Sequence, residues 1–583
     1  MCGIFFSLSD TGFVNPEEDT QRIIRNRGPD SYRTHQVRFT RREPSDCDCR
    51  GEPECNRYLT FTSSVLALRG DHLEVQPLID TASQSVLCWN GEAWKISSEL
   101  VSGNDTHQIF QLFLESVKPL VDSTESTQAK SLLTKLAHAI SSISGPFSFV
   151  LYDGVGSRII YGRDFLGRKS LLSGCDSKGN LKISSVCDGT SSNFFEEVTT
   201  DGIHIIDLTR DVQSDVSSLT VETIPWSAPI PPMNRRIPET ESVFPLVTSS
   251  SSVLKLEGLL RQSVELRVQK IPDPPSFSSG GAKLAVLFSG GLDCTILARL
   301  AHELLPIYEP IDLLNVAFEN PRVAAANLAN SGSSNSIYED CPDRKTGRSS
   351  YAELRQVCST RSWNFVCINV PYTETIQLRE EIRRLMRPHN TEMDLSISCA
   401  LYFASRGIGE LSGNGCAEAL VPYMTAARVL LSGLGADEVF AGYKRHALAF
   451  ARQGFKGLID EIDLDVGRLG KRNLGRDDRI ISNWGREVRY PYLDEDFLTW
   501  AFQQPVWEKC GFGATSSDYA PVGGHSAVCY EEPDIESDKK ALRLVAWNLG
   551  LKTVAREKKR AIQFGSRTAK MESGRSKGTQ VLS

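Results

Sequence analysis

Residues 284–294 read LAVLFSGGLDC, and this stretch decides the fold of the second half of the chain. Its first part, Leu284–Phe288, is a short apolar run typical of a buried strand. The glycine pair lets backbone amides approach an anion closely at the start of a following helix. Asp293 is placed to hold a magnesium ion that bridges phosphate oxygens. No Gly-Lys-Ser/Thr follows, which excludes the lysine-bearing phosphate loop, and a plain tight turn is the simpler alternative.

Strands and helices alternate on the carboxyl-terminal side of this stretch. We expect further helices over 295–305 and 350–361, and further strands over 313–318, 365–370 and 429–431. Such alternation predicts an α/β fold with a parallel sheet covered by helices. Two polar stretches, 319–348 and 407–416, are expected to be insertions, and the basic tail 570–583 is expected to be disordered.

The first two hundred residues follow a different pattern. Short β-leaning runs are separated by polar or glycine turns at 65–68, 86–89, 147–152, 158–161 and 182–185, with helical patterns at 106–115 and 129–143. This predicts an antiparallel α+β domain. Prolines and serines concentrated in 224–252 predict a linker, so we expect one domain over 2–223 and a second over 253–569.

Composition excludes several classes of protein. The chain has 583 residues, 40% hydrophobic and 23% charged, with net charge −7. That charge gives no electrostatic footprint for nucleic acid or an anionic membrane. No apolar run approaches the ~18 residues that a membrane-spanning helix needs, and no signal peptide is visible. The odd number of cysteines, 15, predicts reduced thiols and therefore a cytoplasmic protein. The charge and the absence of a long apolar run predict no nucleic acid and no membrane as partners.

The stretch 284–294 resembles the pyrophosphate-binding loop of ATP pyrophosphatases, which activate a carboxylate as an acyl-adenylate. The family motif usually ends in serine, whereas this chain has Cys294, a poorer hydrogen-bond donor. Residues 432–438, SGLGADE, resemble the nucleotide loop of asparagine synthetases. Leu434 stands there in place of a glutamate, which the related β-lactam-forming synthetases also lack. Losing that carboxylate leaves an apolar surface beside the substrate.

The resemblance to asparagine synthetases implies a nucleotide site with bound Mg²⁺. The ligands of the magnesium ion would be Asp293 and Asp437. Lys559, in a basic run at 558–560, would stabilise charge that builds on the acyl-adenylate, although a solvated basic run is nearly as good a reading. ATP would contact Leu287, Ser289, Gly290, Gly291, Asp293, Cys294, Val316, Ser432 and Gly433.

Cysteine stands second in the chain, in Met1-Cys2-Gly3-Ile4. If Met1 is removed, Cys2 carries a thiol and a free α-amine, and the amine can act as base for the thiol. From its position alone, Cys2 is better interpreted as an ordinary small residue after the start methionine. The segment nevertheless resembles the start of class II glutamine amidotransferases, which are N-terminal nucleophile enzymes, as do 27–30, RGPD, and 90–92, NGE.

This second resemblance implies a complete glutamine site. Cys2 would be the nucleophile, and the Asn90 side chain with the Gly91 amide would hold the oxyanion. Arg27 would bind the α-carboxylate of glutamine in two-point fashion, while Glu92 and Asp105 would neutralise its α-ammonium.

Together the resemblances imply a glutamine-dependent, ATP-consuming amidoligase of the asparagine synthetase family, converting aspartate, glutamine and ATP to asparagine, glutamate, AMP and pyrophosphate. Residues 393–397 and 559–566 resemble its branch of asparagine synthetase domain-containing proteins. Two alternatives remain open. Leu434 alters the acceptor side, so another small carboxylate could replace aspartate. Cys294 and Leu434 also fit a degenerate synthetase kept as a binding or scaffold protein. The predicted glutamine site around Cys2 argues against this alternative, because a scaffold protein has no need of it.

Overall fold

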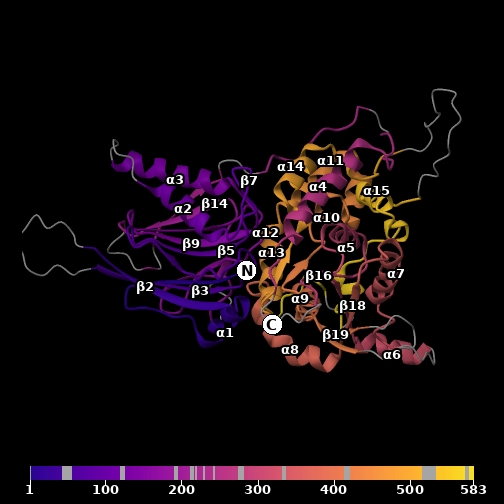
Figure 1. Ribbon diagram of the computed structural model, residues 1–583, viewed down its shortest axis with the longest axis horizontal. Helices are drawn as coiled ribbons and strands as arrows, with labels where there is room; N and C mark the ends of the chain where they lie inside the picture. Colours follow the sequence, from indigo (N-terminus) through magenta and orange to yellow (C-terminus); the bar gives the residue numbers. More distant parts are fainter. Residues whose placement is uncertain are drawn as a thin grey trace, which may run out of the picture.

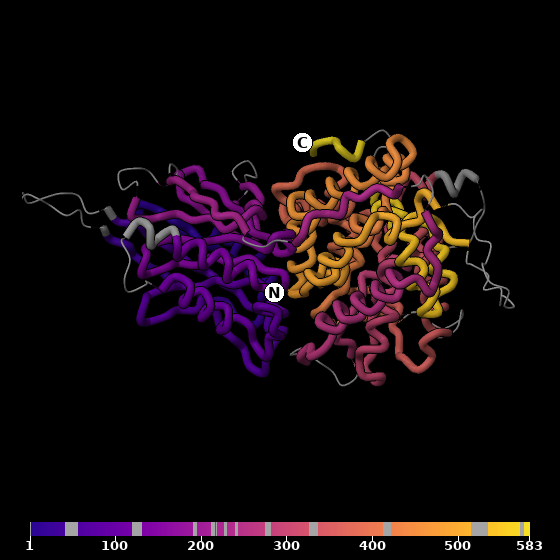
Figure 2. Tube along the Cα trace, turned by 90° about the horizontal axis from the view of Figure 1, so that it is seen from above, coloured from indigo at the N-terminus to yellow at the C-terminus, as the bar shows by residue number. Residues whose placement is uncertain are grey.

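Two halves of the chain lie side by side, and the amino terminus lies at the boundary between them (Figures 1 and 2). The computed structural model describes residues 2–41, 55–118, 125–189, 195–210, 216, 219–226, 230–239, 243–273, 281–330, 336–411, 421–514, 534–571 and 577–582. No helix within these ranges combines the length and the apolar character that a membrane crossing requires.

The first half contains two six-stranded antiparallel sheets. One has the order β13-β11-β12-β1-β3-β2 and the other β15-β14-β10-β9-β5-β4. The strands of the first are β1 Cys2–Ser9, β2 Ser31–Arg41, β3 Cys55–Val65, β11 Leu172–Cys175, β12 Leu181–Ser184 and β13 Phe195–Glu197. Those of the second are β4 Leu78–Ile79, β5 Val86–Gly91, β9 Phe147–Asp153, β10 Arg158–Arg163, β14 Gly202–Asp207 and β15 Val221–Pro225. A small sheet joins β6 Lys95–Ile96, β7 Glu99–Leu100 and β8 Ile143–Ser144.

Side chains from the two large sheets meet in one apolar core that includes Phe6, Phe61, Val86 and Val150. The outer face of the second sheet packs against α2 Thr106–Val117 and α3 Glu125–Ser141. Helix α1 Glu18–Arg27 contacts β1 on the far side of the first sheet (Figure 1). The layers are therefore helix, sheet, sheet and helix, which confirms the expected α+β class.

The second half is built on a seven-stranded sheet, order β20-β19-β18-β17-β16-β21-β22. Its strands are β16 Leu284–Leu287, β17 Ile311–Phe318, β18 Trp363–Val370, β19 Ile408–Leu411, β20 Val421–Met424, β21 Val429–Leu431 and β22 Glu487–Arg489. Five neighbouring strands are parallel to one another, namely β18, β17, β16, β21 and β22. At one edge of the sheet, β19 pairs antiparallel with β18 and β20 pairs antiparallel with β19. The expected α/β parallel sheet is confirmed.

Helices surround this sheet on both faces (Figure 1). The longer ones are α4 Ser251–Val268, α5 Leu292–Leu304, α6 Pro321–Asn330, α7 Pro342–Val357, α8 Tyr372–Met386, α9 Glu392–Arg406, α11 Lys444–Val466, α13 Leu474–Ser482, α14 Glu495–Gln503 and α15 Lys540–Asn548. Short helical turns are α10 Ala436–Val439, α12 Leu469–Arg472, η3 Pro491–Leu493, η4 Val506–Glu508, α16 Lys552–Ala555 and α17 Ile562–Gly565.

Four local predictions of secondary structure or disorder are wrong in part, while the interpretation of 319–348 and 407–416 as insertions stays a prediction. No strand spans 65–68, which the structure describes in full. Strand β3, which pairs with β1 and β2, lies before this stretch and ends at Val65. The stretch 319–348 contains α6 and the start of α7, and 408–411 is the strand β19, paired with β18; residues 331–335 and 412–416 lie outside the described residues. Part of the tail is ordered, because Glu392 N donates to Gln580 O at 2.9 Å and Leu582 N to Asn390 O at 2.7 Å.

Candidate functional site

The two predicted loops meet at one edge of the parallel sheet. Strand β16 pairs with β21, and each is followed directly by its glycine-containing loop. Because the carboxyl ends of parallel strands share an edge, the loops lie against each other. The contact is tight: a side chain on Gly433 would come within 2.8 Å of the Asp293 Cβ. Glycine at this position therefore lets the 432–435 loop lie directly over the 289–293 loop.

Two carboxylates from these loops converge on one lysine. The Lys539 Nζ lies 2.9 Å from Asp293 Oδ2 and 2.9 Å from Asp437 Oδ1, and Lys559 forms a second ion pair with Asp437. Burial raises the pKa of Asp293, although Lys539 opposes that effect. Burial acts in the same direction on Asp437, but Lys539 and Lys559 outweigh it and lower its pKa. Asp437 is thus an anion held by two cations.

A cavity of about 780 Å³ opens over these groups. Its size falls within the ~300–1,000 Å³ range of small-molecule sites. Gly290 is the one predicted nucleotide residue outside its lining, since this glycine packs against Gly347 instead. The other predicted residues of this half line the cavity: Leu287, Ser289, Gly291, Asp293, Cys294, Val316, Ser432, Gly433, Asp437 and Lys559.

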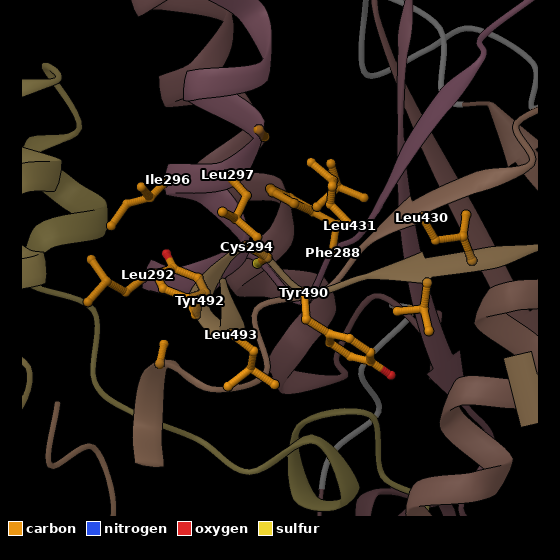
Figure 3. Packing of buried hydrophobic residues seen from close by; sticks show 14 of the residues in the cluster. Phe288, Leu292, Cys294, Ile296, Leu297, Leu430, Leu431, Tyr490, Tyr492 and Leu493 are labelled. Carbon is orange, nitrogen blue, oxygen red and sulfur yellow. The ribbon is translucent and has the colours of Figure 1, made fainter. Parts of the chain in front are cut away.

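Cys294 lies among apolar side chains below the loop. Figure 3 shows it surrounded by residues of α5, the β21 strand and the 490–493 segment. Its Sγ donates to Gly291 O at 3.3 Å and lies 3.7 Å from Ser289 Oγ. The thiol thus bonds within the loop, and burial raises its pKa, so it is held as the neutral thiol.

The Asp293–Asp437 pair suits a magnesium ion in its chemistry. Mg²⁺ binds through one or two carboxylates together with substrate phosphates. Both carboxylates already point toward a single cation, the Lys539 ammonium, so their oxygens converge on one place. Within the described ranges no cluster of three or more candidate metal ligands occurs, so a bound ion would depend on phosphate oxygens for the rest of its shell.

A second, much smaller cavity of about 30 Å³ lies beside Cys2 in the first half. Cys2 is buried, burial raises the pKa of its thiol, and Gln76 Nε2 lies 3.8 Å from its Sγ. The Cys2 backbone N donates to Asn90 Oδ1 at 2.9 Å, and Asn90 Nδ2 has no hydrogen-bond partner among the described residues. The amide that was predicted to bind an oxyanion is therefore beside Cys2 with a donor to spare.

Glu92 and Asp105 line the same cavity. Asp105 accepts hydrogen bonds from Ala93 N at 2.7 Å and Trp89 Nε1 at 3.3 Å. Burial raises the pKa of Glu92 to about 7 against the opposing effect of Arg489 and Arg69, and burial also raises the pKa of Asp105. The structure thus brings together Cys2, Asn90, Gly91, Glu92 and Asp105 as predicted.

Arg27 lies next to this group but outside the cavity, and its Nε donates to Cys2 O at 3.4 Å. Its guanidinium is fully buried, with Nη2 2.8 Å from Asp478 Oδ2 and Nη1 donating to Ser482 Oγ, both in the second half of the chain. It does not line the cavity beside Cys2, whereas Arg69 does. Arg27 therefore bonds across the interface between the halves, and its role as a ligand of the glutamine carboxylate stays a prediction.

Two other groups in the large cavity were not predicted from the sequence. Lys539 stands in a pair of lysines, which ordinarily indicates a solvated surface, yet it is 2% exposed. Tyr443 OH donates to Glu438 Oε1 at 2.6 Å, and both residues line the large cavity. Glu438 lies within the quoted 432–438 loop, but its partner is five residues away and no spacing pointed to it.

Comparisons with known proteins place the chain in a family. Asparagine synthetase domain-containing protein 1 of Mus musculus is 32% identical, over 99% of this chain and 98% of its own length. The chain belongs to the asparagine synthetase domain-containing proteins. A glutamine-hydrolyzing asparagine synthetase of Zea mays is 23% identical over 84% of this chain and 67% of its own. No family profile matches the chain.

Solved structures offer a more distant comparison for this member of the asparagine synthetase domain-containing proteins. A glutamine phosphoribosylpyrophosphate amidotransferase from B. subtilis has 13% identity and a TM-score of 0.20. The match covers 54% of this chain and 66% of that one.

Proposed function

We propose that this protein is a glutamine-hydrolysing carbon–nitrogen ligase that activates a carboxylate with ATP. The observation that carries the proposal is the convergence of Asp293 and Asp437 on Lys539 inside the large cavity, at the carboxyl ends of β16 and β21. Ligands of open α/β sheets bind at this edge. The family resemblance supports aspartate as the simplest acceptor.

In the first half, the Cys2 thiolate attacks the side-chain carbonyl of glutamine. The α-amine of Cys2, free once Met1 is removed, takes the thiol proton and passes it to the leaving ammonia. The oxyanion is stabilised by Asn90 Nδ2 and the Gly91 amide. Water then cleaves the thioester, which releases glutamate and regenerates the thiol. Glu92 and Asp105 bind the substrate ammonium.

In the second half, an acceptor carboxylate oxygen attacks the α-phosphorus of ATP, and pyrophosphate leaves. Ammonia attacks the carbonyl of the acyl-adenylate, AMP leaves, and the amide forms with loss of a proton. Lys559 and Lys539 neutralise negative charge on the phosphates and the adenylate. A magnesium ion held by Asp293 and Asp437 would supply further charge neutralisation at the phosphate oxygens.

The test is acid-dependent release of pyrophosphate from ATP by the full-length protein. Asp293→Ala should reduce that release by at least about a hundredfold, as loss of a key electrostatic group does in other enzymes. Asp312→Asn is the matched control, because Asp312 is buried on the neighbouring strand but does not line the cavity. Equal release by wild-type protein and Asp293→Ala contradicts the nucleotide site.

Cys2→Ala tests the other half of the reaction. It should abolish glutaminase activity while sparing synthesis with ammonia, since Cys2 lies outside the nucleotide cavity. Cys88→Ala is the control, because Cys88 is a buried cysteine on β5 that does not line the Cys2 cavity. Glutaminase activity retained by Cys2→Ala removes the nucleophile assignment.

A further inference from the structure

The large cavity continues well beyond the nucleotide loops. Its wall also includes Leu434 and, from helix α9, Met393, Ile397 and Leu401. Leu434 is partly buried and packs against the core of this half. The Met393 side chain, 41% exposed, and the partly buried Ile397 present apolar surface to the space. An acceptor that extends from the nucleotide would therefore contact an apolar strip.

Basic side chains line part of the cavity wall. Six arginines are among them, and four are paired with carboxylates: Arg445 with Asp465, Arg476 with Asp394 and Asp477, Arg543 with Asp538, and Arg560 with Asp343. The other two, Arg468 and Arg472, form no side-chain hydrogen bond or ion pair with any residue in the described part of the chain. Two uncompensated guanidinium groups on one cavity wall attract an anion, and arginine binds carboxylate or phosphate in two-point fashion.

We infer that the acceptor is an amphipathic acid, longer than aspartate, that carries a second anionic group. Its reacting carboxylate would lie beside the nucleotide, its apolar body along Leu434 and the α9 strip, and its second anionic group at Arg468 and Arg472. This inference rests on the proposed function, because it names the substrate class of the same site. It also gives Leu434 a role: an apolar wall at the position where asparagine synthetases have a carboxylate.

The experiment measures exchange of labelled pyrophosphate into ATP by the full chain with suberate, octanoate or aspartate as the acid. Suberate has a methylene chain between two carboxylates, and octanoate has the same length with one. We expect kcat/KM for suberate to exceed those for octanoate and aspartate by about tenfold or more, the gain of a charge-assisted contact. Arg468→Ala/Arg472→Ala should raise the KM for suberate by a similar factor, with kcat, octanoate exchange and glutaminase unchanged.

Lys471→Ala is the matched control, since Lys471 is an exposed cation on the same helical turn that does not line the cavity. Exchange with aspartate but not suberate overturns the inference and leaves the proposed function standing. An unchanged KM for suberate in the double arginine variant also overturns the inference. Exchange with none of the acids overturns the inference and the proposed ligase activity together.

Discussion

Glu92 is the residue whose ionisation controls the proposed glutamine site. Its carboxylate lies 3.6 Å from Arg69 Nε and 3.3 Å from Arg489 Nη2, yet its pKa is raised to about 7 because it is buried. Only the ionised form attracts the α-ammonium of glutamine. Below pH 7 the group is increasingly protonated, so the attraction is lost as pH falls.

We therefore expect the KM for glutamine to fall as pH rises toward 7 and to level off above it. For a single titrating group the change is about tenfold for each pH unit below the pKa. Glu92→Gln should have a high KM without this dependence, measured from initial glutaminase rates on both sides of pH 7. A wild-type KM that is flat across this range contradicts the role of Glu92.

Single residues also mark the limit of prediction from sequence. Cys2, Asn90, Gly91, Glu92 and Asp105 were predicted as a group and lie together. Arg27 was predicted with them but bonds to Asp478, more than four hundred positions away. Neighbouring sequence carries no information on such a long-range partner, and the same is true of Lys539.

At the scale of elements, the strands that lead into the loops were predictable because their apolar runs are buried. Val429–Leu431 agrees with β21 residue for residue, and Leu284–Phe288 with β16 to within one. Helix α6 and the strand β19 were missed because their polar, Gly- and Ser-rich surroundings resemble loops. Tertiary packing against β18, rather than local propensity, makes 408–411 a strand.

The turn η4 is followed by Lys509, a buried lysine outside the site. Its Nζ has no hydrogen-bond partner within the described ranges, and burial lowers its pKa to about 8. Below that pH the lysine is a charged ammonium in both folded and unfolded protein, so folding bears the full free-energy cost of burying a charge. As pH rises toward the unfolded value of about 10.4, the unfolded lysine also loses its proton and the cost disappears.

Lys509→Met should accordingly stabilise the protein by about 1–3 kcal/mol at pH 7, with the gain shrinking above pH 8. Thermal unfolding at two pH values measures both effects. Lys178→Met, at an exposed turn, should change the midpoint little. A lowered midpoint for Lys509→Met at pH 7 would show that Lys509 has a stabilising partner.

Buried ion pairs cross the boundary between the two halves of the molecule. Arg27 pairs with Asp478, and Lys169 Nζ lies 2.9 Å from Glu487 Oε2, with all four side chains at most 1% exposed. Removing one partner of a buried pair costs about 3–5 kcal/mol because the other charge is left uncompensated. Arg27→Met and Asp478→Asn should each lower the thermal midpoint, and the double variant should recover part of the loss. Strictly additive losses would show that the pair is not coupled.

Arg489 connects the two sites across this interface. Its backbone carbonyl accepts a hydrogen bond from Ser432 N at 3.0 Å, in the loop proposed to bind the nucleotide. Its side chain lies 2.7 Å from Glu487 Oε1 and 3.3 Å from Glu92 Oε1, and Glu92 belongs to the proposed glutamine site. Arg489 lowers the pKa of Glu92 against the larger effect of burial, so a residue of the second half influences the charge of a residue in the first.

Arg489→Met should therefore shift the pH dependence of the glutamine KM to higher pH and raise the KM at pH 7. Pyrophosphate release with ammonia as nitrogen source should stay within about twofold, because the backbone bond to Ser432 does not depend on the side chain. Arg486→Met is the control: Arg486 is buried nearby but bonds to the Ala427 and Thr425 carbonyls, so its loss affects stability without moving the profile. An unshifted profile in Arg489→Met means that Arg489 does not control Glu92.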